Sequence, residues 1–287
     1  MSVGLIGRSN REARAFETHA ASDVASDVVN EVVSQTASGL KTQIDHIVVV
    51  AHTLEQGVAW CEATLGITPE AGGEHPQFGT HNRLFKIATP TFPLVYFEII
   101  AIKNNATNNI AVKAINTPAI GQNSTKNNRW FDMDDAALQA AVVKEPRLVH
   151  FVAQTDDIQA GRNALKALGI DRGPAVEASR HTRKGRLEWK ITVRDDGQRL
   201  FNGALPSLIQ WGKTGAAEPL RLHPRNTLPR SGVSLQSVAI TSPTPEKLHA
   251  AYSAIGLVGV AVSEGVANLT VTLKTPKGLV QLQSHGI

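Results

Sequence analysis

Hydrophobic and polar positions along the chain repeat the same order of elements three times. Each repeat starts with an apolar run, passes through a polar turn and continues into a segment with apolar residues at helical spacing, which ends in Leu-Gly or Ile-Gly. The repeats begin QIDHIVVVAHTLEQGVAWCEATLGI, PRLVHFVAQTDDIQAGRNALKALGI and VSLQSVAITSPTPEKLHAAYSAIGL. Further apolar segments follow each helix, so the pattern predicts a strand, a helix and then two or three strands, three times over.

Residues at both ends of each expected helix support this interpretation. Side chains that cap helix N-termini stand at the polar turns: Thr53, Thr155 or Asp156, and Thr244. Glycines that suit helix C-termini follow the last turn: Gly66, Gly169 and Gly256.

The repeats predict how the chain is divided. The segments are a partly helical N-terminal extension (1–41), a first βαβββ module (42–102), a long connecting loop (103–145), a second module (146–213), a linker (214–232) and a third βαβββ-like module (233–287). Within a compact domain, a connection as long as 103–145 tends to have a function.

The repeats, together with their motifs, resemble a known family. The motifs are IDHIVVVA, HPQFGTHNRLF, YFEIIA, RWFDMDD and LPSLIQWG followed by HP. In this order they resemble the glyoxalase-like domain of the vicinal oxygen chelate superfamily, over roughly residues 42 to 286. The resemblance implies an α+β fold in which repeated βαβββ modules form a curved, cup-like mixed sheet, with a third module after the pair. Related cups host isomerases, dioxygenases, epimerases and ligand-sequestering proteins, so the fold does not fix the chemistry.

Polar residues interrupt the apolar strands at corresponding places. Alternation in a strand puts His46 on one face with Val48 and Val50, and His150 stands at the same place in the second repeat. The third repeat has Ser237 there. In the last strand of each repeat, the polar residues Glu98, Gln210 and Gln281 are expected to stand at corresponding positions.

The resemblance implies that the two modules bring inward side chains to a shared divalent metal. Carried over residue by residue, the ligands are His46, Glu98 and His150, and the metal is Zn, Ni, Mn or Fe. Gln210 would bind substrate or act as a weak fourth ligand. Glutamine accepts no proton at neutral pH, so either Glu98 is also the catalytic base, or another residue takes the proton, or the reaction is a different one. The alternative is a pair of hydrogen-bonded core histidines, with an arginine instead of a metal beside Glu98.

Two further motifs supply candidates for the rim of the pocket. In GGEHPQFGTHNRLF, His75 and Asn82 are expected to bind substrate, and His81 is a candidate acid or base. In RWFDMDD, Arg129 and Trp130 are expected to close over a planar or anionic substrate. The alternatives are a histidine that hydrogen-bonds loop backbone in the first motif and a hydrophobic anchor in the second.

Composition narrows the class of protein. A net charge of +4 and a pI near 9.3, without a dense Lys/Arg stripe, do not favour nucleic-acid binding. The single cysteine, Cys61, excludes an internal disulfide framework. No apolar run is long enough for a membrane span, and no secretory signal is recognised, so a cytoplasmic location is expected. A homodimer is expected if the third module pairs with its twin; otherwise that module would cap a sheet edge.

These observations lead to one leading hypothesis and two alternatives. The leading hypothesis is a metal-dependent, glyoxalase-like enzyme of the lyase or isomerase type. It would act on a small oxygenated substrate that chelates the metal through vicinal oxygens. The alternatives are an extradiol-type ring-cleaving dioxygenase and a metal-free protein that binds a small ligand in the same cup.

Overall fold

The structure is a computed structural model, and it describes residues 39–103, 129–182, 184–213 and 217–286. The described residues belong to one compact unit, Ser38–Ile287. The expected helix in the N-terminal extension and most of the long connection lie outside them. Among the described helices, none is both apolar enough and long enough to cross a membrane.

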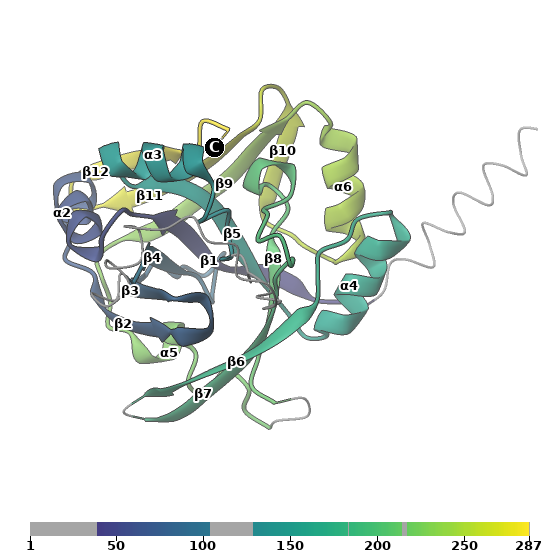
Figure 1. The fold of residues 1–287 in the computed structure, drawn as a ribbon, viewed down its shortest axis with the longest axis horizontal. Coiled ribbons are helices and arrows are strands. Elements are labelled where there is room, and N and C mark those ends of the chain that lie inside the picture. Colours follow the sequence, from purple (N-terminus) through teal and green to yellow (C-terminus); the bar gives the residue numbers. More distant parts are fainter. Residues whose placement is uncertain (1–38, 104–128, 183, 214–216, 287) are drawn as a thin grey trace, which may run out of the picture. The chain divides into compact units, whose positions relative to one another are not determined.

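The first two repeats form the two halves of one eight-stranded sheet. The first half contains β1 (Thr42–Val50), α2 (Leu54–Leu65), β2 (Glu70–His75), β3 (Thr80–Lys86) and β4 (Tyr96–Ile102). The second contains β5 (Arg147–Thr155), α4 (Ile158–Ala167), β6 (Ala175–Thr182), β7 (Gly185–Thr192) and β8 (Ser207–Trp211). The strand order is β2-β3-β4-β1-β5-β8-β7-β6 (Figure 1).

The halves meet at the antiparallel pair β1 and β5, and each half has the same internal pairing. In each, the first strand runs parallel to the last strand, as in β1 with β4 and β5 with β8. The outer strands β2 and β6 approach each other, so the sheet curves until it is nearly closed. The expected fold class, a curved mixed sheet built from βαβββ modules, is confirmed.

Helix ends follow the expected caps closely. Thr53 caps α2 by accepting a hydrogen bond from the Gln56 amide, and Gly66 ends that helix in the left-handed region. The cap of α4 is Asp157, one or two residues beyond the positions expected from the sequence. Thr244 stands at the N-cap of α6 (Pro245–Ala254) but makes no side-chain capping bond.

The curved sheet has a hydrophobic core on each face. The outer core contains Ile47, Phe97 and Phe151 and packs the sheet against α2 and α4. The inner core lies on the concave face and contains Val48, Ile191 and Ile209. A short segment before α3 (Ala136–Lys144) adds Trp130 and Phe131 to the inner core.

The third repeat has the expected order of elements along the chain but a different strand order. It contains β9 (Ser234–Ser242), α6, β10 (Val260–Glu264), β11 (Asn268–Thr275) and β12 (Gly278–Gln283). These strands form a separate sheet of order β10-β9-β11-β12, in which the first strand lies beside the second rather than beside the last. The third repeat therefore does not reproduce the pairing of the other two.

The second sheet packs on a face of the large sheet rather than at one of its edges. Its buried residues, including Leu235, Val238 and Val271, join the outer core with Ile47 and Phe151. The expectation that the third module caps an open edge is therefore corrected. Its pairing in a homodimer stays a prediction.

Candidate functional site

A β-bulge in β1 turns two neighbouring acid-base side chains toward the concave face. Ile44 pairs with Ala153 and His46 with Val152, which leaves Asp45 as an extra residue between them. An extra residue interrupts the alternation of side chains. Asp45 and His46 therefore point the same way, while Ile44 and Ile47 both face the outer core.

Asp45 is fully buried and accepts hydrogen bonds from three rings. His46 Nδ1 lies 2.6 Å from Oδ1, and Oδ2 accepts from Trp211 Nε1 at 2.8 Å and from His223 Nε2 at 2.9 Å. Burial alone would raise the pKa of Asp45, but the charge and hydrogen bonds of His223 and His46 outweigh it and hold the pKa well below its ordinary value. Asp45 is therefore a carboxylate, and it fixes the proton of His46 on Nδ1.

The other nitrogen of His46 faces Glu98. His46 Nε2 lies 3.6 Å from Glu98 Oε2, too far for a hydrogen bond but close enough for both atoms to contact one small ligand. Tyr96 stacks on the imidazole with ring centroids 4.6 Å apart. These positions follow from the parallel register, which sets His46 beside Tyr96 and Val48 beside Glu98.

Asn82 and a glycine hold Glu98 in place. Asn82 Nδ2 donates to Glu98 Oε1 at 2.5 Å, and Asn82 Oδ1 accepts from the Gly73 amide at 2.7 Å. A Cβ at Gly72 would collide with the Asn82 side chain and lie 2.6 Å from its carbonyl oxygen. The Gly-Gly pair in β2 therefore gives Asn82 the space it needs to orient Glu98.

Aromatic and apolar side chains enclose these polar groups. His46, Glu98 and Asn82 line a cavity of about 30 Å³ together with His75, Leu84, Tyr96, Trp130, Phe131, Arg180, Leu187, Trp189, Ile191, Ile209 and Trp211. This volume is roughly the share of one water molecule in the liquid. A ligand of more than a few atoms therefore enters only if side chains that line the cavity move.

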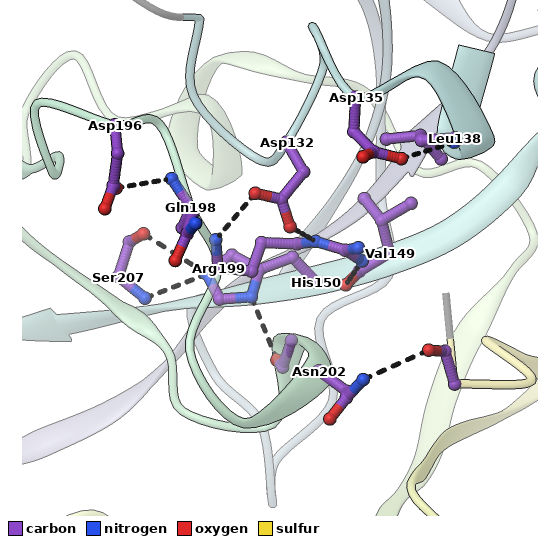
Figure 2. A network of polar contacts seen from close by, with 12 residues as sticks. Asp132, Asp135, Leu138, Val149, His150, Asp196, Gln198, Arg199, Asn202 and Ser207 are labelled. Atoms are coloured by element: carbon purple, nitrogen blue, oxygen red, sulfur yellow. Dashed lines mark hydrogen bonds and ion pairs between the residues drawn. The ribbon is translucent and has the colours of Figure 1, made fainter.

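Trp130 and Phe131 reach the cavity from a strained turn. Phe131 and Asp132 both have positive φ, at 59° and 56°, where side chains are disfavoured. Arg199 stabilises this turn, since its Nε donates to Asp132 Oδ2 at 2.8 Å and its Nη1 to the Val149 carbonyl at 2.8 Å (Figure 2). Strain of this kind is found most often at functional sites.

His75 forms a neutral polar wall of the cavity. Its ring packs edge-on against Trp130, with centroids 5.0 Å apart, and its Nδ1 lies 3.1 Å from Thr80 Oγ1. Burial, followed by the charge of Arg180, lowers the pKa of His75 to about 3. His75 is therefore uncharged at neutral pH.

His150 lies at the place equivalent to His46, with both ring nitrogens in hydrogen bonds. Its Nδ1 donates to the Gly203 carbonyl at 2.9 Å, and its Nε2 accepts from the Ser207 amide at 3.0 Å (Figure 2). The buried Arg172 guanidinium also lies beside Nε2, at 3.4 Å. Burial and then the charge of Arg172 lower the pKa of His150 well below its ordinary value. His150 does not line the cavity.

The register corrects the expected match between the closing strands. Val48 pairs with Glu98 in the first half, and its equivalent Val152 pairs with Ser207 in the second. Ser207, not Gln210, is thus the counterpart of Glu98. Gln210 faces the outer side and accepts a hydrogen bond from the Ile158 amide at 3.0 Å, where it supports the start of α4.

The donor set does not fit the metal centre that the sequence predicted. A ligand nitrogen needs a free lone pair, and that of His150 Nε2 already accepts the Ser207 amide. Only His46 and Glu98 of the predicted triad lie together. Across residues 39–103, 129–182, 184–213 and 217–286, no group of three His, Cys, Asp or Glu side chains is arranged to hold a metal.

Two further expected site residues lie away from the cavity. His81 alternates with Asn82 in β3 and is half-buried on the opposite face, near the charges of Glu55 and Lys103. Arg129 pairs with Asp134, both through its backbone amide at 2.7 Å and through its guanidinium. The expectations for His81 as an acid or base and for Arg129 as a substrate contact are therefore corrected.

Sequence reasoning missed five residues that build the site: Asp45, Tyr96, Arg180, Trp211 and His223. Strict alternation hid Asp45, because a bulge leaves no mark in the pattern of apolar residues. The HP pair that ends the last motif was the one available signal for His223, which caps α5 (Pro224–Thr227) as well as binding Asp45. Nothing in the surface-like β6 pattern indicated Arg180.

Comparisons with solved structures return distant neighbours. A hypothetical protein from Staphylococcus aureus has 16% identity and a TM-score of 0.49, covering 84% of this chain and 85% of that one. Streptomyces coelicolor methylmalonyl-CoA epimerase has 16% identity and a TM-score of 0.32, covering 58% and 95%. Streptomyces coelicolor 4-hydroxymandelate synthase has 13% identity and a TM-score of 0.40, covering 85% and 62%. With TM-scores below 0.5, none of them bears on the site.

The comparison with family models is decisive for membership. No curated protein matches the sequence. The model described as "Glyoxalase-like domain" matches residues 44–256, which is most of the chain and includes the residues of the cavity. The chain therefore belongs to the glyoxalase-like domain family.

Proposed function

We propose that this protein is a glyoxalase-like enzyme of the isomerase or lyase type that moves a proton at a carbon beside a carbonyl group. Its substrate is a small oxygenated molecule bound in the concave cavity. The observation that carries the proposal is a histidine fixed by one carboxylate on Nδ1 and facing a second carboxylate with Nε2. A buried imidazole with a fixed proton and a free lone pair is the usual form of a general base.

His46 takes the part of the base in this reaction. Its Nε2 accepts the proton of the C–H bond, and the electron pair of that bond moves into the carbon–carbon bond of an enolate. Asp45 and Glu98 flank the ring as it gains charge, at 2.6 Å and 3.6 Å. His46 then returns the proton to the original carbon, which restores the carbonyl group. In a 2-hydroxy carbonyl substrate it can instead deliver the proton to the neighbouring carbon, while the hydroxyl proton of the original carbon passes to the enolate oxygen and the original carbon becomes the new carbonyl.

The enolate oxygen needs a hydrogen-bond donor, and Trp130 supplies one. Trp130 Nε1 is buried at the cavity and has no hydrogen-bond partner. A positioned donor that stabilises developing negative charge commonly contributes several kcal/mol in a dry site, about 3 kcal/mol in measured cases. The aromatic residues around Trp130 exclude water, which strengthens that interaction.

The test is exchange of carbon-bound hydrogen with solvent deuterium, followed by proton NMR. The panel is hydroxyacetone, lactaldehyde, glyceraldehyde and pyruvate. We expect the wild type to exchange at least one of them, and His46→Gln to lower that rate by about 100-fold or more. Asp45→Asn lowers it as well, because the imidazole loses its fixed proton position.

His81→Gln is the matched control, since His81 lies in β3, two strands from His46 and on the opposite face of the sheet. Dialysis against EDTA is expected to leave the rate unchanged, because only His46 and Glu98 of the predicted metal ligands lie together and His150 Nε2 already accepts a hydrogen bond. Absence of exchange across the panel, an unchanged rate in His46→Gln, or a loss after EDTA that one divalent metal restores would each contradict the proposal.

A further inference from the structure

One cation in the cavity, Arg180, forms no ion pair with the other residues that line it. Arg180 projects from β6, and its guanidinium lies in the cavity with His46, His75 and Glu98. Its Nη1 is buried and makes no hydrogen bond. A buried donor without an acceptor is rare in proteins, and a charged one is more costly than a neutral one. This atom therefore calls for an acceptor that the chain itself does not supply.

The two carboxylates of the site interact with groups other than Arg180. Asp45 accepts from His46, Trp211 and His223. Glu98 accepts from Asn82 through Oε1, and its Oε2 faces His46 Nε2 at 3.6 Å. Among the described residues, Arg180 forms no ion pair with any carboxylate. Asp45, His46 and Glu98 thus interact with one another and with their neighbours, whereas Arg180 has no anionic partner among the described residues.

The neighbouring strand leaves room for the guanidinium. Arg180 reaches from β6 to β2, where a Cβ at Gly73 would collide with its Nη1 and lie 3.0 Å from its Cδ. Gly73 makes this approach possible because it has no side chain. The same Gly-Gly pair that positions Asn82 through Gly72 therefore also positions Arg180 through Gly73.

We infer that Arg180 binds a carboxylate of the substrate, so that the enzyme acts on small 2-oxo or 2-hydroxy acids rather than on uncharged carbonyl compounds. A guanidinium presents parallel N–H groups that match the two oxygens of a carboxylate. The aromatic walls exclude water and strengthen this charge pair. Held by its carboxylate at Arg180, a short acid places its next carbons between that residue and His46. This inference rests on the proposed function for the reaction, but its test measures binding alone.

The experiment compares two acids with their uncharged amides. Binding of pyruvate, pyruvamide, lactate and lactamide is measured at pH 7 by isothermal titration calorimetry. Quenching of tryptophan fluorescence gives a second signal, since Trp130, Trp189 and Trp211 line the cavity. The wild type is expected to bind at least one acid about 10-fold or more tightly than its amide. In Arg180→Gln that preference falls to about one.

Two other variants separate a specific role from a loss of structure. Arg186→Gln is the matched control, because Arg186 is an exposed residue of the adjacent strand β7, outside this cavity, and it keeps the preference. Gly73→Ala leaves the charge unchanged and displaces only the tip of Arg180, so it reduces the preference. Thermal unfolding of each variant verifies that it is folded.

The outcomes distinguish this inference from the proposed function. Equal binding of acids and amides by the wild type, or a preference that survives Arg180→Gln, overturns the carboxylate site. His46→Gln is expected to keep the preference for acids while it loses exchange. If the wild type prefers acids through Arg180 yet exchanges none of the panel, the carboxylate site stands and the proposed proton transfer fails.

Discussion

His46 and His150 occupy equivalent places in the two halves but have opposite surroundings. His46 has a carboxylate on each side, whereas His150 has a carbonyl, a backbone amide and an arginine. The second set holds His150 as a neutral ring in place, whereas the first leaves Nε2 of His46 without a hydrogen bond. Residue type alone therefore did not distinguish a functional histidine from a structural one.

The buried neutral His75 predicts a fall in stability as the pH is lowered. Its pKa is about 3 in the folded protein and about 6.5 in an unfolded chain. Below pH 6.5 the unfolded chain gains a proton that the folded one does not, so the free energy of unfolding decreases by up to roughly 1.4 kcal/mol per pH unit from this group. His75→Asn is expected to flatten the slope between pH 6.5 and 5, as measured by urea unfolding.

His150 acts in the same direction, so the slope in His75→Asn becomes smaller without vanishing. His52→Asn is the control for loss of an imidazole, because His52 is exposed on the surface. Equal slopes in the wild type and in His75→Asn would show that His75 is not held neutral in the folded protein.

At the scale of single elements, β2 predicts different consequences for two neighbouring glycines. Ala at position 72 would clash with both the side chain and the backbone of Asn82, whereas Ala at position 73 meets only the flexible end of Arg180. We expect Gly72→Ala to lower the free energy of unfolding by about 1–3 kcal/mol and Gly73→Ala to change it much less. Chemical denaturation of both variants gives the comparison.

Gly39→Ala is the control, because no atom lies within 4 Å of a Cβ placed there. A loss of stability that is equal in Gly72→Ala and Gly73→Ala would mean that the Asn82 contact does not set the position of β2.

The elements themselves were largely predictable, and their register was not. Apolar periodicity located the first strand, the helix and the last two strands of each repeat, including the caps Thr53 and Gly66. It missed β2, β6 and β10, which have no long apolar run, and it missed α3 in the long connection. The bulge at Asp45 and the offset between Ser207 and Gln210 depend on which residues pair across strands. Pairing is a property of tertiary structure, so the repeat pattern alone placed Gln210 opposite Glu98, three residues from the true counterpart, Ser207.

At the scale of the whole described unit, both sheets share one hydrophobic core. Leu269 of β11 is almost fully buried in the outer core, while Val266 in the turn before it is exposed. Leu269→Ala is expected to lower the free energy of unfolding by about 2–5 kcal/mol, and Val266→Ala by less than about 0.5 kcal/mol.

The positions of the tryptophans make this test specific. All four tryptophans, at positions 60, 130, 189 and 211, precede the third repeat, so their fluorescence reports on the first two repeats alone. If the two sheets share one core, the unfolding transition of Leu269→Ala shifts to lower denaturant by the same amount in tryptophan fluorescence and in circular dichroism. A fluorescence transition that stays in place would show that the third repeat unfolds independently.

The third repeat marks the limit of repeat-based prediction. Its order of elements along the chain matched the others, but β9 lies beside β10 instead of beside β12. Apolar patterning determines which face of a strand is buried and does not determine its neighbour. Similarly, a charged residue such as Arg180 becomes recognisable as part of a cavity only when β6 is placed next to β2.

The extra residue in β1 bears on how this protein could be re-engineered. The pairing of β1 with β5 fixes the direction in which Asp45 and His46 point. Single substitutions elsewhere in the cavity therefore leave that direction unchanged. A library of such substitutions would therefore change which substrates fit the cavity while Asp45 and His46 stay in place. Moving Asp45 and His46 requires the insertion or deletion of one residue in β1. Such a change also turns the neighbouring side chains to the other face of the sheet.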